Sequence, residues 1–240
     1  MHTYTQQIVR LYADHADPAQ AEPMKSYMRG LFPFLGIRMP KRTELTRELL
    51  RNHGLPADED LPAVVLELWQ LPEREYQYAA LALLTKTAAK APRDRIALLE
   101  QLITSKPWWD TVDHLAGTLV GAYMNKYPDQ IPTYTARWLD SGELWLQRSV
   151  LLFQLKYKGQ TDTDLLFDAI RRTARDKDFF IRKAIGWALR EYSKTDPEAV
   201  IRFTKENELS PLSEKEALKW LERKTNTKAP ANPDRTLETE

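Results

Sequence analysis

Hydrophobic positions recur along most of the chain with the spacing of one face of an α-helix. Ile8, Leu11 and Tyr12 share one such stripe, and Leu98 and Leu102 share another. No stretch alternates apolar and polar residues in the manner of a strand, and no Asn-Gly or Asp-Gly pair marks a hairpin. The pattern predicts an all-α protein of about thirteen helices, beginning near Thr3, Pro23, Lys41, Asp60, Glu73, Pro92, Trp109, Gln130, Leu144, Asp162, Phe179, Pro197 and Ser213.

Local signals fix some of these boundaries more sharply than others. Asp196-Pro197 has the form of an N-cap followed by a proline in the first turn, and Ser213 to Glu216 has the form of a capping box. The helical pattern ends near Lys224. We therefore expect one domain over residues 1–224 and a loosely ordered tail over residues 225–240.

A repeat emerges when the predicted helices are aligned. Segments that open at Tyr76, Trp109, Trp145, Phe180 and Ser213 superpose, with spacings of 33, 36, 35 and 33 residues. A period in the mid-thirties that is built from helix pairs is typical of an α-solenoid. The sequence thus predicts about six antiparallel helix pairs stacked around a concave face.

One copy of the repeat breaks the rule that the others follow. The fifth aligned place holds Ala80, Ser149, Ala184 and Ala217, but the second copy holds Asp113. Small residues there indicate close helix packing, whereas a carboxylate without partners costs several kcal/mol to bury. Two interpretations stay open: this helix is rotated so that Asp113 faces water, or the carboxylate is held at a functional site.

Composition excludes several kinds of chemistry. The chain has no cysteine, and its four histidines are not spaced as helical metal ligands, so disulfides, thiol catalysis and histidine-rich metal sites are disfavoured. No glycine-rich phosphate loop is present, and we expect no cofactor. The longest aliphatic run, 79–84, is far too short for a membrane helix, and the N-terminus does not resemble a signal peptide. A cytoplasmic protein without a membrane partner is expected.

Charge is distributed unevenly, although the net charge is only +1. Residues 25–51 carry a net charge of +5 and residues 143–194 a net charge of +4, while the intervening stretch 52–104 carries −3. Basic stretches of this kind fit a polyanion bound along one face, although charged residues most often mark solvated helix surfaces.

Aromatic, acidic and basic residues recur at related positions within successive repeats. Trp109 lies one helical turn before Asp113, and Trp145, Arg148 and Trp187 follow in the next two repeats. A tryptophan is usually a core anchor and an arginine usually part of a surface ion pair. If these residues lie on one face, however, they would form a site in which aromatic rings flank a carboxylate, next to a cationic side chain that can bind phosphate. We expect three other tryptophans to be structural: Trp69, Trp138 and Trp220.

Longer stretches carry a resemblance that spans Met1 to about Lys224. They are Ala21-Glu-Pro-Met, Tyr27-Met, Phe34-Leu-Gly-Ile, Glu67-Leu-Trp, Leu71-Pro-Glu-Arg-Glu, Trp108-Trp-Asp-Thr-Val-Asp, Trp145-Leu-Gln-Arg, Phe153-Gln-Leu-Lys-Tyr-Lys and Lys183-Ala-Ile-Gly-Trp-Ala-Leu-Arg-Glu-Tyr. With these stretches the chain closely resembles the AlkD-like DNA glycosylases of the DNA alkylation repair family.

The resemblance implies a HEAT-like α-solenoid whose concave face grips duplex DNA. The implied activity is hydrolysis of the N-glycosidic bond of cationic N3- or N7-alkylated purines, the first step of base excision repair. The family's catalytic acid falls on Asp113, its aromatic walls on Trp109 and Trp187, and its backbone-gripping arginine on Arg148. Tyr27 matches a further cleft residue.

Other basic and aromatic residues are expected to contact DNA beside these. They are Lys41, Arg42, Phe179, Phe180, Arg182, Lys183 and Arg190. Where the family pattern has Gln-Thr before the proline of the third helix, this chain has Arg38-Met39. We therefore expect its contacts with the DNA strand opposite the damaged base to differ. No lysine other than Lys183 falls among the recurring cleft positions, which favours a monofunctional enzyme without Schiff-base chemistry. Neither a protein partner nor an oligomer is implied.

Two non-enzymatic alternatives remain. A solenoid of this kind can be a scaffold that binds duplex DNA or protein without catalysis, but such a scaffold has no need of the acid at Asp113. A peptide-binding adaptor would be expected to carry Asn and acidic residues on its concave face. The basic excess between Arg148 and Lys194 argues against the adaptor.

Overall fold

The computed structural model describes residues 1–226, and every regular element within that range is helical. The chain forms two compact units, Met1–Thr133 and the part from Tyr134 onward. The last helix ends at Asn226, so two residues of the predicted tail are helical, and residues 227–240 lie outside the described range. No described helix has the length and apolar character needed to cross a membrane.

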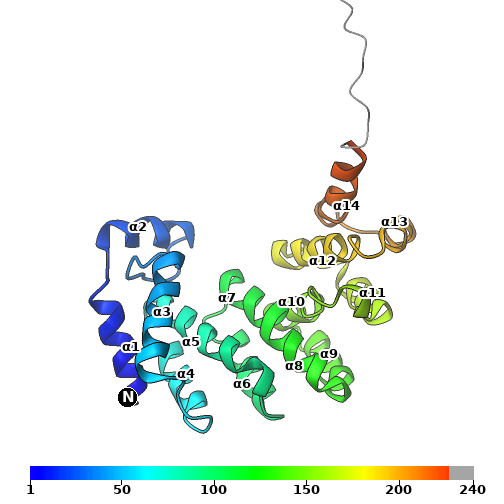
Figure 1. Cartoon of the computed structure of the whole chain (residues 1–240). Helices are drawn as coiled ribbons and strands as arrows, with labels where there is room; N and C mark the ends of the chain where they lie inside the picture. The colour runs from blue at the N-terminus through cyan, green and yellow to red at the C-terminus, as the bar shows by residue number, and fades with distance from the viewer. Residues whose placement is uncertain (227–240) are drawn as a thin grey trace, which may run out of the picture. The chain divides into compact units, whose positions relative to one another are not determined.

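Unit 1 contains the first eight α-helices (Figure 1). In chain order they are α1 (Thr3–Ala13), α2 (Pro18–Tyr27), α3 (Met39–His53), α4 (Leu61–Gln70), α5 (Arg74–Thr87), α6 (Arg95–Thr104), α7 (Trp109–His114) and α8 (Gly121–Lys126). The short turns η1 (Ala88–Lys90) and η3 (Pro128–Gln130) and the π-helical segment η2 (Leu115–Val120) complete this unit.

Unit 2 contains the remaining helices, and its boundary with unit 1 falls in the first turn of α9. They are α9 (Ile131–Asp140), α10 (Leu144–Leu152), α11 (Thr163–Thr173), α12 (Phe179–Tyr192), α13 (Pro197–Glu206) and α14 (Pro211–Asn226), with the short turn η4 (Lys158–Gln160) before α11.

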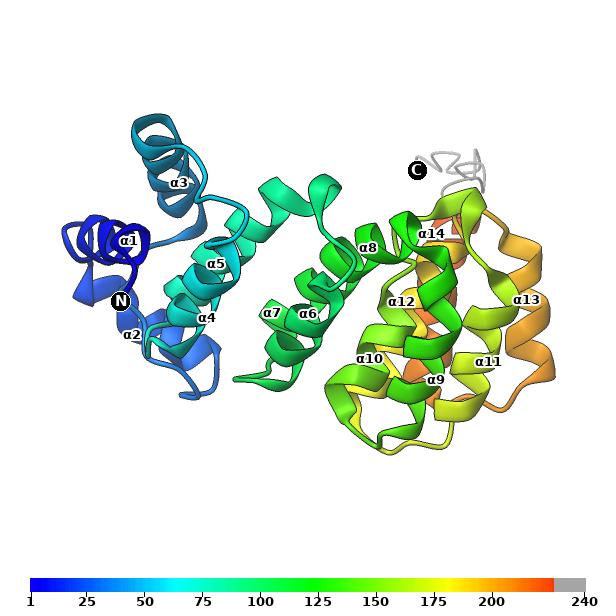
Figure 2. The ribbon, with the colours of Figure 1, turned by 90° about the horizontal axis from the view of Figure 1, so that it is seen from below.

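Helices of unit 2 stack in two layers. α10 packs on α12 and α12 packs on α14, while α9, α11 and α13 form the second row (Figure 2). Gly186 permits the close crossing of α12 and α14, because a Cβ atom there would lie 2.5 Å from the Cβ of Glu216. Stacked pairs of this kind, in a chain that is helical throughout its described part, are consistent with the predicted α-solenoid and confirm the fold class.

Unit 1 follows the same principle around α5. α4 and α7 both contact α5, as does the π-helical segment that follows α7. Trp69 of α4 is 1 % exposed, and its indole Nε1 donates to the carbonyl of Ser105 over 2.8 Å, so this tryptophan is a core anchor, as predicted. Trp138 of unit 2 is also 1 % exposed, whereas Trp220 is half-buried.

Most predicted helix starts agree with the structure to within about three residues, and one does not. The Asp196 carboxylate accepts from the amide of Ala199 over 2.9 Å and α13 begins at Pro197, as predicted. Helix α2 begins five positions before the predicted Pro23, because Asp17 caps it and Pro23 is tolerated inside the helix.

The predicted capping box at the last helix is wrong. Helix α14 begins at Pro211, and the Ser210 hydroxyl accepts from the Ser213 amide over 3.1 Å. Ser213 is buried and donates instead to the carbonyl of Arg182. Glu216, the other member of the predicted box, forms ion pairs with α12.

A buried carboxylate fixes the loop between α2 and α3. Glu75 is fully buried and accepts backbone N–H groups from Leu35, Gly36 and Ile37 over 2.9–3.1 Å. Gly36 has a φ of +90°, and a Cβ atom there would lie 1.9 Å from the carbonyl oxygen of Asp17. Only glycine fits this turn, so the Phe34-Leu-Gly-Ile stretch and Glu75 form one structural unit.

Candidate active site

The predicted site residues are divided between the two units. Unit 1 holds Tyr27, Lys41, Arg42, Trp109 and Asp113. Unit 2 holds a larger set: Arg148, Phe179, Phe180, Arg182, Lys183, Trp187 and Arg190. A cleft that Asp113 and Trp109 share with Trp187 therefore stays a prediction, and each half of the site has its own geometry.

Asp113 does not occupy the buried place of its aligned counterparts. Ala80, Ser149, Ala184 and Ala217 are all fully buried, in agreement with the packing interpretation. Asp113 is half-buried, and neighbouring residues of the same helical run supply the core contacts instead. The carboxylate is thus partly accessible, unlike the side chains at the aligned positions.

A π-helical segment, η2, begins two residues after Asp113. It follows α7 directly and spans Leu115–Val120, within one continuous helical run from Trp109 to Lys126. A π-segment accommodates extra backbone in a helix and shifts the register of its side chains, and such segments occur frequently at functional sites. It also divides one predicted helix into α7 and α8.

Aromatic side chains surround the exposed edge of α7. Trp109 is half-buried and lies one turn before Asp113 on the same helix face. The ring of Tyr27, which is 70 % exposed, meets the Trp109 ring edge-on with centroids 6.0 Å apart. The Arg29 guanidinium lies 5.9 Å from the ring centroid of Trp108. The end of α2 therefore contacts the start of α7, while the role of Tyr27 in a DNA-binding cleft stays a prediction.

A buried ion pair anchors this start of α7 to α5. Arg74 is fully buried and makes two hydrogen bonds to the Asp110 carboxylate, over 2.9 Å from Nε and 2.8 Å from NH2. Arg74 also donates to the Thr111 hydroxyl and to the carbonyl of Lys106, both over 2.9 Å. Because Asp110 lies between Trp109 and Asp113, the pair fixes the turn that carries both.

Tyr78 and Arg42 extend the anchor. The Tyr78 hydroxyl donates to Asp110 over 2.7 Å, and burial together with the Asp110 charge raises the pKa of Tyr78 above its usual range. The Arg42 guanidinium lies 4.2 Å from the Tyr78 ring centroid and donates to the carbonyl of Ile37. Burial lowers the pKa of Arg42. Arg42 thus has partners inside unit 1, while its contact with DNA stays a prediction.

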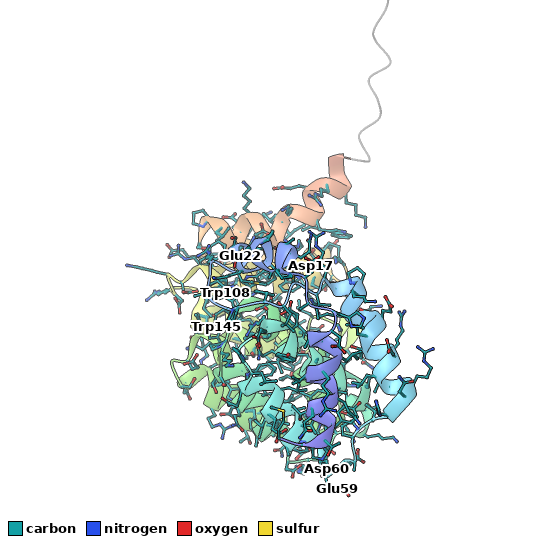
Figure 3. The ribbon with its side chains drawn as sticks, turned by 90° about the vertical axis from the view of Figure 1, so that its left-hand side faces the viewer. Asp17, Glu22, Glu59, Asp60, Trp108 and Trp145 are labelled. Atoms are coloured by element: carbon teal, nitrogen blue, oxygen red, sulfur yellow. The ribbon has the colours of Figure 1, made fainter. Side chains whose placement is uncertain are left out.

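The N-terminus of α3 lies two positions before the predicted start. The helix begins at Met39 rather than at Lys41, and Lys41 pairs with Glu44 over 3.0 Å on the exposed surface. Two other acidic residues, Glu59 and Asp60, lie at the opposite end of unit 1 from Trp108 (Figure 3). They contribute nothing to the surroundings of α7.

Arg148 and its surroundings form one part of the unit 2 half. Arg148 is only 4 % exposed, and its guanidinium donates to the carbonyl of Phe180 and lies 5.9 Å from that residue's ring centroid. The Phe180 ring packs on Trp145 with centroids 5.0 Å apart. Trp145 is a core residue, and Phe179 beside this cluster is 54 % exposed.

Three predicted residues share one face of α12. Lys183, Trp187 and Arg190 are spaced four and three positions apart, which places them together. Glu216 of α14 pairs with Lys183 over 3.0 Å and also with Arg190. The hydrogen bond from Lys183 and the cationic neighbours hold the pKa of the Glu216 carboxyl below its ordinary value of 4.5. The half-buried Trp187 therefore lies beside an ion-paired cluster.

Sequence reasoning missed the residues that hold the site in place. Arg74, Asp110 and Glu216 all became apparent only in the structure. A signal existed for Asp110, because it shares the Trp108-Trp-Asp-Thr-Val-Asp stretch with Asp113. For Arg74 and Glu216 the decisive partners lie about 30 residues away in sequence, beyond any local pattern.

Stacked helix pairs that carry aromatic, acidic and basic side chains define a repeat protein of the α-solenoid class. The chain belongs to the family of DNA alkylation repair enzymes, whose model matches residues 8–221. A solved structure described as a predicted DNA alkylation repair enzyme from Enterococcus faecalis is 36 % identical. The match covers 86 % of this chain and 96 % of that one, with a TM-score of 0.80. No curated protein matches the chain significantly.

Proposed function

We propose that this protein is a monofunctional DNA glycosylase that hydrolyses the N-glycosidic bond of cationic N3- or N7-alkylated purines in duplex DNA. Membership of the repair family supports a role in DNA alkylation repair. The observation that carries the finer proposal is the half-buried Asp113, one turn from Trp109 on a helix that a buried ion pair anchors.

The substrate itself explains why so few groups suffice. Alkylation at N3 or N7 gives the purine a formal positive charge, so the base already leaves well without protonation. As the bond between C1′ and the base nitrogen breaks, its electron pair moves to the base, which becomes neutral, and positive charge develops on the sugar. A carboxylate at Asp113 stabilises that charge.

Water completes the reaction. A water molecule attacks C1′ and its oxygen forms the new bond, while Asp113 accepts the proton as general base. The products are the free base and an abasic site. Trp109 and Tyr27 offer aromatic side chains to a cationic base or sugar, each contributing about 0.5–2 kcal/mol through cation–π attraction.

Release of the free base from alkylated DNA tests the proposal. Purified protein is incubated with duplex DNA that contains 7-methylguanine, and the released base is separated and quantified. We expect release by the wild type above the spontaneous rate, with an abasic site left in the strand. DNA binding without base release would instead support the non-catalytic scaffold.

A further inference from the structure

A basic pocket opens in unit 2, and Trp187 is not among its lining residues. It lies where the ends of α11 and α13 meet the starts of α12 and α14, and has a volume of about 540 Å³. Helices α11 and α13 run side by side there (Figure 2). Its polar and charged lining consists of Arg171, Arg175, Lys177, Arg182, Asn207, Glu208 and Ser210.

The pocket gathers cations that have no acidic partner. Four cationic side chains line it against the single carboxylate of Glu208, an excess of three positive charges. Among residues 1–226, none of the four takes part in an ion pair. The neighbouring Arg172, by contrast, pairs with Asp140. Like charges that converge without counter-charges repel one another, so the arrangement favours an anionic ligand.

Two of the arginines are held in place before any ligand arrives. Arg171 donates from Nε to the Asn207 side-chain oxygen over 3.2 Å, and its guanidinium lies 5.3 Å from the ring centroid of Phe203. Arg182 donates from Nε to the carbonyl of Asp176 over 3.0 Å. In both cases the bond made by Nε orients the guanidinium and leaves its terminal nitrogens for a ligand, the geometry suited to phosphate oxygens.

We propose that the basic pocket binds phosphate groups of the DNA backbone, so that Arg171, Arg175 and Lys177 extend the contact predicted at Arg182. The excess of three charges matches consecutive phosphates of a strand better than a single carboxylate. The pocket includes one of the predicted DNA contacts, because Arg182 lines it. DNA as the source of the phosphate rests on the proposed function.

The test combines a double substitution with a matched control. Arg175→Gln with Lys177→Gln removes two exposed cations that make no side-chain hydrogen bond within residues 1–226, so the fold should be unaffected. The control is Arg202→Gln with Lys205→Gln, which also removes two exposed cations of unit 2 but lies outside the pocket. Binding of undamaged duplex DNA is measured by fluorescence anisotropy across a range of salt concentrations.

We expect the double variant to bind about tenfold more weakly at low salt. The slope of log affinity against log salt should become less negative by about 0.9 for each phosphate that the variant no longer binds. The control should bind as the wild type does. Unchanged affinity and slope in the double variant, or an equal weakening in the control, would overturn the proposal.

Inorganic phosphate separates a DNA contact from a site for free phosphate. If phosphate raises the Tm of the wild type but not of the double variant, while DNA binding is unchanged, the pocket serves free phosphate and the DNA contact is refuted. Base release distinguishes this proposal from the proposed function. If the wild type releases the base and the double variant binds DNA as the wild type does, only the pocket proposal is refuted. If the double variant binds DNA more weakly but the wild type releases no base, only the glycosylase proposal is refuted.

Discussion

The Arg74–Asp110 pair offers the most quantitative prediction, because both side chains are almost fully buried. Arg74 is 0 % exposed and the Asp110 side chain 6 %. Asp110→Asn keeps the shape of the side chain but removes the charge that faces the guanidinium. The amide also places a donor where the carboxylate accepted from Arg74 and Tyr78.

Breaking a buried pair by removing one partner typically destabilises a protein by about 3–5 kcal/mol. For a chain of this size each kcal/mol lowers the Tm by about 2–4 °C, so we expect a fall of about 6–20 °C. Differential scanning calorimetry measures the change. Asp140→Asn, which disrupts the exposed pair with Arg172, serves as the control and should leave the Tm nearly unchanged.

A fall in Tm no larger than that of the control would refute the anchoring role of Asp110. It would mean that α7 is held by its apolar contacts alone. The position of Trp109 and Asp113 would then require another explanation.

Three further predictions follow from contacts in the two units. Trp69→Ala should destabilise the fold by about 3–5 kcal/mol, because this side chain is in the core. Trp109→Ala should leave the Tm much closer to that of the wild type but reduce base release. Equal falls in Tm would place Trp109 in the core. Gly186→Ala should lower the Tm, because its Cβ would lie 2.5 Å from that of Glu216, and an unchanged Tm would contradict the close crossing. Glu216→Gln should lower the Tm at neutral pH and, by releasing Lys183 and Arg190, strengthen DNA binding. Because the folded-state pKa of Glu216 is lowered, its ion pairs contribute fully to stability above pH 4.5, and this contribution is lost as the pH falls further. The Tm values of wild type and variant should therefore converge in acid. A difference in Tm that persists in acid would refute the ion pair.

The sequence was sufficient for the fold because helical periodicity is local. Most predicted starts agree with the structure, and the small residues at Ala80 and Ala184 are buried as the repeat requires. The predicted start of α2 is wrong because Asp17 is an N-cap whose signal competes with that of Pro23. The π-helical segment η2 is not predicted, because helical periodicity alone does not distinguish it from an α-helix.

The residue types of the candidate site can be predicted from the sequence, but the buried contacts that hold those residues in place cannot. Asp113 stands out because it breaks the repeat, and its side chain is half-buried where those of its aligned counterparts are fully buried. An arginine such as Arg148 usually lies at the surface, yet this one is buried against Phe180. Long-range pairs such as Arg74 with Asp110 leave no local pattern, so only the folded chain identifies them.

The rate of base release by Asp113→Asn tests the proposed mechanism most directly. The substitution preserves side-chain volume and removes the charge, and it is assayed under single-turnover conditions on duplex DNA containing 7-methylguanine. We expect the rate to fall by about 10²–10⁴, with the Tm unchanged or higher and DNA binding unchanged or tighter. A variant that releases the base at the wild-type rate would remove Asp113 from the mechanism and contradict its assignment as the catalytic carboxylate.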